Sequence, residues 1–267
     1  MELGLIIDAN SKADFERLAS FGIKYAELCI NVGTDAKKYL DRAEEIAAWT
    51  EETGTAVASI GRWGTNRLNP DGSFNEPEYQ NDLALIALCG KLGCTSFVCG
   101  CNEPREVKSF DDRIACAVKY FAALIEAGKP SGVHINVYNC DWNNFVWGYK
   151  TWDKIFPLLP ELGLKYDISH CLNRGGDYMQ ELMQYGVRIG HFHVKGTVRV
   201  HGRNVQDPPA GLDDIPWGAV FAILYHHKYN GVCSIEPHSG IWNTGEQGDW
   251  GIRFARDFIG KYLFHAG

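Results

Sequence analysis

Residues 164–195 read LKYDISHCLNRGGDYMQELMQYGVRIGHFHVK and contain one complete strand–helix–strand unit. The apolar run Leu164–Ser169 is typical of a buried strand, and Asp177–Tyr185 has the periodicity of a helix. Ile189–Lys195 then reads as a second strand. Strands joined through a helix in this way normally lie parallel. The stretch therefore predicts an α/β fold.

The same alternation runs through all 267 residues, at about 33 residues per unit. Strands are predicted over Leu3–Asp8, Tyr25–Ile30, Thr55–Gly61, Ser96–Cys101, Val133–Asn139, Leu164–Ser169, Ile189–Lys195 and Val232–Pro237. Helices are predicted over Lys12–Phe21, Lys37–Thr53, Glu76–Leu92, Asp111–Ala127, Trp152–Leu162, Asp177–Tyr185, Trp217–Tyr229 and Asp249–Tyr262. Eight such pairs predict a single (β/α)8 TIM barrel over residues 1–267. An open doubly wound sheet would usually have a Gly-rich turn after its first strand, where this chain has Asp8-Ala9-Asn10-Ser11.

The composition excludes several classes of protein. Hydrophobic residues make up 45% of the chain, which is too many for a disordered protein. No apolar run approaches the roughly 18 residues that cross a bilayer. The net charge of −7 argues against a general nucleic-acid binder. Nine scattered cysteines, and an N-terminus without a signal-peptide pattern, predict a cytoplasmic protein.

Three polar residues stand at the ends of three consecutive predicted strands, namely Asp167, His193 and Glu236. Functional side chains of a TIM barrel lie at the carboxyl ends of its strands, so these three are expected to converge. Carboxylate and imidazole ligands together suit a divalent cation such as Mn²⁺, Zn²⁺, Mg²⁺ or Co²⁺. The alternative is structural, with Asp167 capping the next helix, Glu236 paired with a lysine and His193 satisfied in the core.

Several motifs resemble those of one family. In chain order they are Glu27 in the second strand, Asp167-x-x-His170, His193 followed six residues later by Arg199, Gly211–Trp217, and Glu236-Pro237. The chain resembles the xylose-isomerase-like barrels, which include sugar-phosphate isomerases, ketose 3-epimerases, inosose dehydratases and endonuclease IV. The resemblance covers most of the chain and implies a small carbohydrate as substrate. It is also compatible with a homo-oligomer, because family members are often dimers or tetramers.

The resemblance also implies roles for individual residues. Asp167, His193 and Glu236 would bind the metal, and Glu236 would also be a catalytic base. His170 and Arg199 would contact the substrate. Other residues near the strand ends offer the aromatic faces and hydrogen-bonding groups that suit a sugar, and the predicted substrate contacts among them are Arg62, Trp63, Lys195 and His238.

The fifth strand departs from the family pattern. The family's strand normally ends in a Glu that is both a metal ligand and a base, but the alignment places Tyr138 there. The neighbouring Asn136 and Asn139 supply no carboxylate, and Asp141 is the nearest anionic residue. The loss of this Glu predicts a weak or absent metal and a one-sided reaction. In that reaction Glu236 would be the base, and Tyr138 or a metal-bound water would be the acid.

The leading hypothesis is a metal-dependent sugar isomerase or epimerase that acts on a ketose or related polyol through an enediolate. Two alternatives use the same barrel, a keto-sugar lyase or dehydratase and a catalytically silent sugar-binding protein. A DNA-repair endonuclease is disfavoured. Its additional metal-binding His residues have no counterpart at the third and fourth strand ends, which read Ile60–Trp63 and Val98–Cys101.

Overall fold

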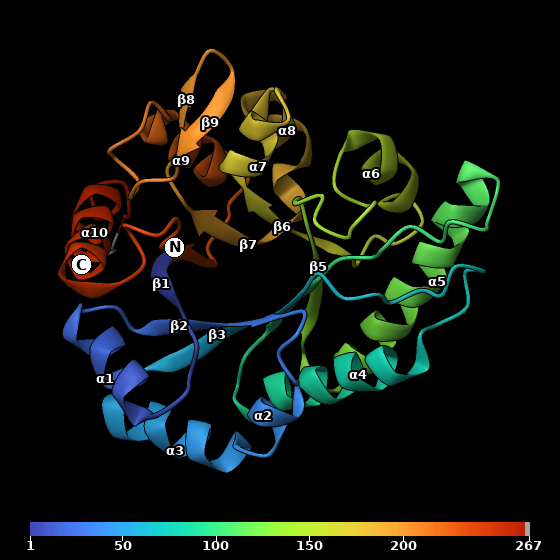
Figure 1. The fold of residues 1–267 in the computed structure, drawn as a ribbon, viewed down its shortest axis with the longest axis horizontal. Helices are drawn as coiled ribbons and strands as arrows, with labels where there is room; N and C mark the ends of the chain where they lie inside the picture. The colour runs from blue at the N-terminus through green and yellow to red at the C-terminus, as the bar shows by residue number, and fades with distance from the viewer. Residues whose placement is uncertain (265–267) are drawn as a thin grey trace.

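The computed structural model describes residues 1–264 and contains a closed barrel of eight parallel strands (Figure 1). Around the barrel the strand order is β1-β10-β7-β6-β5-β4-β3-β2. The strands are β1 (Glu2–Ile7), β2 (Tyr25–Asn31), β3 (Ala56–Trp63), β4 (Ser96–Cys99), β5 (His134–Tyr138), β6 (Gly163–Asp167), β7 (Ile189–Val194) and β10 (Val232–Ile235). The predicted TIM barrel is confirmed. The last three residues of the predicted 1–267 domain lie outside the described residues.

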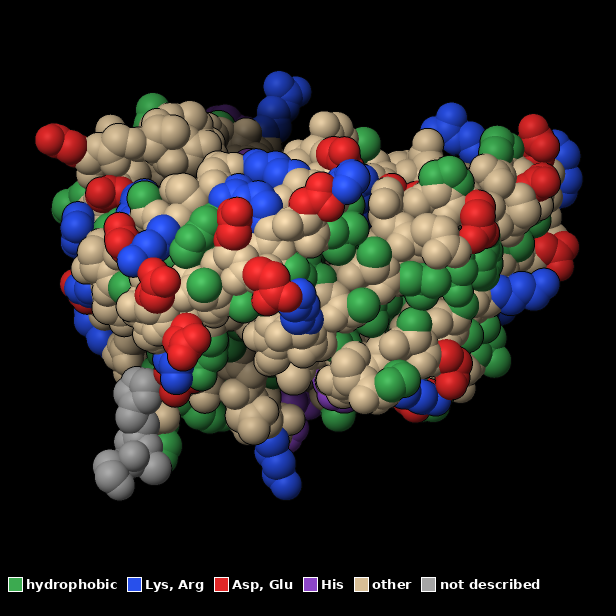
Figure 2. Space-filling model, turned by 90° about the horizontal axis from the view of Figure 1, so that it is seen from below, with side chains coloured by type: hydrophobic (Ala, Val, Ile, Leu, Met, Phe, Trp, Pro, Cys, Tyr) green, Lys and Arg blue, Asp and Glu red, His purple; other side chains and the backbone are tan. Residues whose placement is uncertain are grey.

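Helices surround the barrel and cover its outer face (Figure 1). They are α1 (Lys12–Ser20), α2 (Lys37–Leu40), α3 (Ala43–Thr53), α4 (Glu76–Lys91), α5 (Phe110–Gly128), α6 (Tyr149–Ile155), α7 (Ile168–Asn173), α8 (Tyr178–Tyr185), α9 (Trp217–His226) and α10 (Gly245–Gly260). In the described residues, no helix combines the length and apolar character needed to cross a membrane. Figure 2 shows that positive and negative side chains are interspersed on the side of the barrel that includes α3.

The lower interior of the barrel is a small polar layer. Asn136 on β5 donates from Nδ2 to Oγ of Ser96 on β4 at 3.0 Å. A Cβ atom at Gly163 or Gly190 would lie 2.0 Å or 2.2 Å from Oδ1 of Asn136. Both positions therefore require glycine, because any side chain would collide with this amide. The layer fills the base of the barrel and leaves the carboxyl ends of the strands for larger side chains.

Two predicted helices differ from the structure. The helix predicted over Lys37–Thr53 is divided into α2 and α3, and the buried Tyr39 of α2 donates its hydroxyl to the Asp8 carbonyl at 3.0 Å. That hydrogen bond attaches α2 to the segment that follows β1. The helix predicted over Trp152–Leu162 begins earlier and ends at Ile155 as α6. Pro157 and Pro160 lack the backbone N–H groups that would continue it.

A hairpin that was not predicted lies in the segment after β7. It consists of β8 (Val198–Val200) and β9 (Arg203–Gln206), which pair antiparallel. The two residues that join them, His201 and Gly202, both have positive φ, at 50° and 77°. This is the backbone geometry that favours tight hairpins, and Gly202 adopts it without strain.

The loop after β3 is held by a fully buried ion pair. Arg67 Nε lies 2.7 Å from Asp82 Oδ2 on α4, and both side chains are inaccessible to solvent. We expect Arg67→Met to lower the free energy of unfolding by about 3–5 kcal/mol, because it leaves a buried carboxylate without its partner. Urea denaturation provides the measurement. Lys91→Met is the control, because it breaks the exposed pair with Glu44 and should cost at most about 1 kcal/mol. Equal losses of unfolding free energy in Arg67→Met and Lys91→Met would contradict the stabilising role assigned to the buried Arg67–Asp82 pair.

Candidate functional site

A cavity of about 620 Å³ opens at the carboxyl ends of the strands. This volume is within the range of about 300–1,000 Å³ that is common for small-molecule sites. Its lining includes Trp63 at the end of β3, Cys140 and Trp142 after β5, Lys165 on β6, His170 on α7, His193 on β7 and Lys195 after it, and Glu236 and His238 after β10. The cavity therefore lies where a TIM barrel normally carries its function.

The structure brings most of the predicted site residues to this cavity. The ones that line it are Trp63, His170, His193, Lys195, Glu236 and His238. Asp167 lies below them, fully buried at the end of β6. Arg62, Tyr138 and Arg199 are not among the lining residues. The catalytic, substrate-binding and metal-binding roles assigned to the residues that converge remain predictions.

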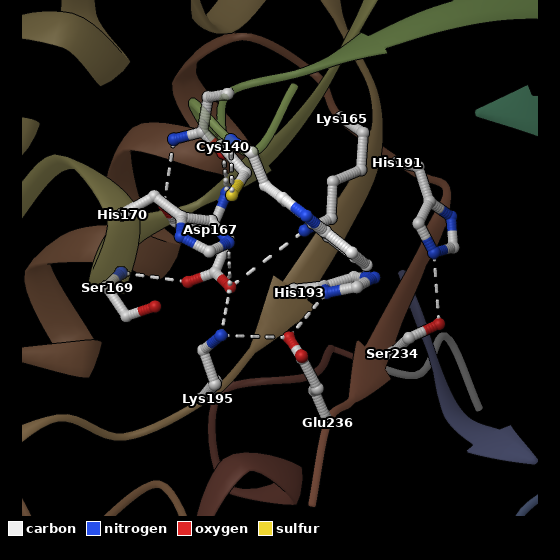
Figure 3. Close-up of polar contacts among 12 residues, drawn as sticks. Cys140, Lys165, Asp167, Ser169, His170, His191, His193, Lys195, Ser234 and Glu236 are labelled. Atoms are coloured by element: carbon white, nitrogen blue, oxygen red, sulfur yellow. Dashed lines mark hydrogen bonds and ion pairs between the residues drawn. The ribbon is translucent and has the colours of Figure 1, made fainter. Parts of the chain in front are cut away.

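Lys195 joins two carboxylates at the floor of the cavity (Figure 3). Its Nζ lies 3.1 Å from Asp167 Oδ2 and 3.2 Å from Glu236 Oε2. Asp167 also caps α7, since its Oδ1 accepts from the Ser169 backbone N–H at 2.8 Å. Both structural roles considered for these carboxylates, a helix cap and a lysine pair, are thus present. They do not by themselves exclude a functional role.

His193 connects this pair of carboxylates to a third one. Its Nδ1 lies 2.9 Å from Glu236 Oε2, and its Nε2 lies 2.9 Å from Glu27 Oε2 on β2. Each ring nitrogen of His193 therefore has a carboxyl oxygen as its hydrogen-bond partner. Burial alone would lower the pKa of His193, but the Glu27 and Glu236 carboxylates outweigh it and raise the pKa.

Two further buried groups were missed by the sequence reasoning. Lys165 of β6 places Nζ 3.9 Å from Asp167 Oδ2 and 5.0 Å from the centre of the Trp63 ring. His191 of β7 places Nε2 2.7 Å from Glu27 Oε2. A lysine in the middle of an otherwise apolar strand is the signal that would have identified Lys165, because a buried lysine is rarely without a partner.

The fit of a divalent cation can be judged from the donor atoms. Asp167, His193 and Glu236 offer ligand atoms within 4.8 Å of one another, and so do Glu27, His191 and His193. However, both nitrogens of His193 already contact carboxyl oxygens, at 2.9 Å from Glu236 Oε2 and 2.9 Å from Glu27 Oε2. The ammonium group of Lys195 also contacts the oxygens that a metal would need. The residues are thus close together, but in this arrangement they do not fit a divalent cation.

Tyr138 occupies a different place from the one expected of a proton donor. Its side chain is fully buried and stacks on Trp63 with ring centres 4.6 Å apart. Its hydroxyl donates to the Trp142 carbonyl at 3.0 Å and accepts from the Gly64 N–H at 3.3 Å. Burial raises the pKa of this phenol. Tyr138 supports the cavity wall from behind, and its assignment as catalytic acid remains a prediction.

The two arginines predicted to contact the substrate have other partners in this structure, and their predicted role stays a prediction. Arg62 turns away from the cavity and forms a buried ion pair with Glu78, with Nε 2.8 Å from Oε1. Its Nη1 donates to the Thr34 carbonyl at 2.8 Å, which fixes the loop after β2. Arg199 belongs to the β8–β9 hairpin and donates to the Gly202 carbonyl. Both arginines therefore stabilise loops in this structure.

A second cavity, of about 570 Å³, lies beside the first. The loop after β5 separates the two, because Cys140 and Trp142 line the first cavity whereas Asp141, Asn143 and Trp147 line the second. The lining of the second cavity also includes amide and charged side chains from the loops after β3 and β4, namely Asn66, Asn102, Glu103 and Arg105. The carboxyl face of the barrel therefore offers polar space on both sides of this loop.

The buried carboxylates make stability depend on pH. Burial alone would raise the pKa values of Glu27, Asp167 and Glu236, but His193 beside Glu27 and Lys195 beside the other two outweigh it and lower all three. In the unfolded chain such groups bind protons with pKa values of about 3.9–4.3. The stabilisation is therefore complete above that range and is lost as the pH falls below it.

We accordingly expect the free energy of unfolding to fall as the pH is lowered from 7 to about 3. Glu236→Gln should reduce the slope of this fall, because one fewer carboxylate takes up a proton on unfolding. Urea denaturation across the pH series measures both slopes, and the exposed-site variant Glu44→Gln is the matched control. The same slope in wild type and Glu236→Gln would show that Glu236 is not held as a low-pKa carboxylate.

Comparisons with known proteins agree with this architecture. D-psicose 3-epimerase from Clostridium cellulolyticum H10, solved with D-tagatose, has a TM-score of 0.80 and 15% identity over 98% of this chain and 99% of that chain. For 3-keto-D-glucoside 4-epimerase from E. coli the TM-score is 0.74, with 15% identity and coverages of 98% and 99%. The IolI protein, solved with a zinc atom, has a TM-score of 0.71 and 18% identity, with coverages of 98% and 99%.

Identities this low establish a shared fold and leave activity open. No curated protein sequence matches the chain. Residues 15–258, however, match the family described as xylose isomerase-like TIM barrel. The match spans all the strands from β2 to β10 and most of the helices. This protein therefore belongs to the xylose isomerase-like TIM barrel family.

Proposed function

We propose that this protein is a sugar isomerase or epimerase that moves a proton on a carbon next to the carbonyl group of a ketose or related polyol. The observation that carries the proposal is the position of Glu236. Its side chain is 20% exposed and lines the cavity, whereas Asp167 and Glu27 are 0% exposed. Of these three carboxylates, it is the one that a substrate can reach.

Glu236 is held for the role of a general base. Its Oε2 contacts both His193 and Lys195, which fixes the carboxylate and keeps it ionised. A base on one face of the substrate is sufficient for 1,2-isomerisation, because it removes a proton from one carbon and returns it to the next. Two-base epimerisation would need a second group on the opposite face. Since Tyr138 faces away from the cavity, the geometry favours isomerisation.

The cavity suits a neutral sugar. Trp63 and Trp142 provide aromatic surface, and His170 and Asn31 provide hydrogen-bonding groups. This combination matches the apolar and polar faces of a carbohydrate. Arg17, which lines the cavity, is paired with Asp249, and the nearby guanidinium groups of Arg62 and Arg67 are paired with Glu78 and Asp82. A phosphate would therefore find no free arginine among these pairs, so we propose an unphosphorylated substrate.

The names of the structural relatives support the same substrate class. One of the similar structures is an epimerase of a keto-glucoside, and another is an epimerase of a ketose. A keto-sugar lyase or dehydratase is the second candidate. It is favoured by the single reachable carboxylate, because β-elimination also needs one base on one face. We propose neither reaction as dependent on a Mn²⁺, Zn²⁺, Mg²⁺ or Co²⁺ ion, because the donor atoms do not fit such an ion.

The base assignment predicts the effect of Glu236→Gln. We expect this variant to lose about 10²–10⁴-fold in turnover, because the amide cannot accept the proton. A panel of ketoses, aldoses, inososes and 3-keto-glycosides would be incubated with the enzyme in D₂O, and NMR would follow deuterium entering the substrate. An isomerised product supports the main proposal, and an unsaturated product supports the lyase.

Glu44→Gln, at an exposed carboxylate, is the control and should keep wild-type turnover. Undiminished exchange by Glu236→Gln would refute the base assignment. Sugar binding without any exchange by the wild type would refute the enzyme proposal and support a catalytically silent sugar-binding barrel.

Tyr138→Phe separates a wall residue from a catalytic acid. The hydroxyl bonds to the Trp142 carbonyl and the Gly64 N–H, so its removal should lower the free energy of unfolding by about 1–3 kcal/mol. Turnover should stay within a few fold of wild type, because the ring still stacks on Trp63. Urea denaturation and the D₂O assay measure the two effects. A loss of turnover as large as that of Glu236→Gln would restore Tyr138 as the acid.

A further inference from the structure

We propose that the ammonium group of Lys195 takes the place of a divalent cation in this barrel and is the electrophile that holds the substrate's carbonyl oxygen beside Glu236. The first half of this inference concerns the folded protein alone. The second half rests on the proposed function.

Position is the first argument. Asp167 and Glu236 are two of the candidate metal ligands. To bind a metal, each would have to direct an oxygen atom at the same cation. Lys195 Nζ already contacts one oxygen of each, at 3.1 Å and 3.2 Å. Figure 3 shows the ammonium group between the two carboxylates, with a contact to each. A metal ion on the same oxygens would be placed next to a like charge.

The charge of the cluster is the second argument. Buried charges are tolerated when they are paired. Two lysines already supply positive charge to these carboxylates: Lys195 contacts Asp167 and Glu236, and Lys165 Nζ lies 3.9 Å from Asp167 Oδ2. A divalent ion on the same carboxylates would add two positive charges beside these two ammonium groups.

The chemistry of an ammonium group fits the remaining task. Lys195 has three N–H donors, and the two ion pairs leave one for a ligand in the cavity that it lines. When Glu236 takes the proton from carbon, the electron pair moves onto the carbonyl oxygen and makes an enediolate. A fixed cation beside that oxygen stabilises the new charge. Glu236 then gives its proton to the former carbonyl carbon, the hydroxyl proton of the neighbouring carbon moves to the former carbonyl oxygen, and the new carbonyl forms on that neighbouring carbon. Lys195 keeps its protons throughout, and no oxidant or second reactant is needed.

The pairing of Lys195 also excludes a different reaction at this residue. An imine with a keto sugar requires a neutral amine. Two carboxylates hold Lys195 in its charged form, so it acts as a hydrogen-bond donor. Borohydride treatment in the presence of a keto sugar should therefore leave the mass of the protein unchanged. A covalent adduct at Lys195 would overturn the assigned role.

The cation part is tested on the full-length protein without any sugar. We expect the purified wild type to contain less than one metal ion per chain. Its Tm should be unaffected by EDTA or by about 1 mM Mn²⁺, because a ligand raises the Tm only of a protein that binds it. Lys195→Met should have a lower Tm, since it leaves Asp167 and Glu236 facing each other. Mn²⁺ should restore that loss and bind the variant at least about tenfold more tightly than wild type.

The control is Lys91→Met, which removes a lysine from an exposed ion pair and should show no Mn²⁺ response. Stoichiometric metal in the wild type, or a Tm that falls in EDTA, would overturn the inference. So would a Lys195→Met variant that gains no affinity for Mn²⁺. If Lys195→Met does not fold, Lys195→Arg takes its place. Because this variant keeps the positive charge, Mn²⁺ should leave its Tm unchanged. A Tm that rises with Mn²⁺ would count against the proposal.

The substrate part is tested with a sugar that the wild type turns over. Lys195→Met should lower kcat by about 10²–10³-fold with a smaller change in KM, because the cation acts mainly on the charge that develops during reaction. Wild-type exchange should be unchanged by EDTA. Equal kcat in wild type and Lys195→Met would overturn the electrophile role. If no sugar reacts with the wild type, the proposed function fails, and the Mn²⁺ measurements still decide the cation part.

Discussion

A set of buried ionisable side chains that links four strands is the constraint on which this site depends. Glu27 on β2 contacts His193 on β7, His193 contacts Glu236 after β10, and Lys195 joins Glu236 to Asp167 on β6. Each charge would be costly to bury alone, and each is compensated by its neighbours. The barrel provides the fixed spacing that this compensation needs. The one partly exposed carboxylate of these three, Glu236, is also the proposed base.

Much of this architecture was accessible from sequence, for physical reasons. Parallel strands of regular spacing end at one edge, so polar residues at successive strand ends must meet. That argument correctly brought Asp167, His193 and Glu236 together and placed Lys195 at the cavity. The pattern of apolar runs located every barrel strand to within a few residues. The local sequence also contained the structural alternatives for Asp167 and Glu236, and both are seen.

Other features depend on contacts between distant segments, which no local pattern reports. Arg62 follows the expected strand, but its partner Glu78 lies on the next helix, and that pairing turns the guanidinium away from the cavity. The alignment identified the missing fifth-strand carboxylate but not the direction of the Tyr138 side chain. The sequence also did not reveal the partner of Lys165. That contact depends on how deep in the barrel β6 places the lysine side chain. Side-chain direction and charge pairing are therefore what the sequence left open.

The stack of Tyr138 on Trp63 has a consequence for how this barrel can change over evolutionary time. Replacing Tyr138 by glutamate would add a carboxylate at a buried position and would also remove the bond to the Trp142 carbonyl. Replacing Lys195 would leave the carboxylates of Asp167 and Glu236 opposed. Either single step passes through a less stable protein. A lineage that has acquired both residues is therefore held in this arrangement by stability alone.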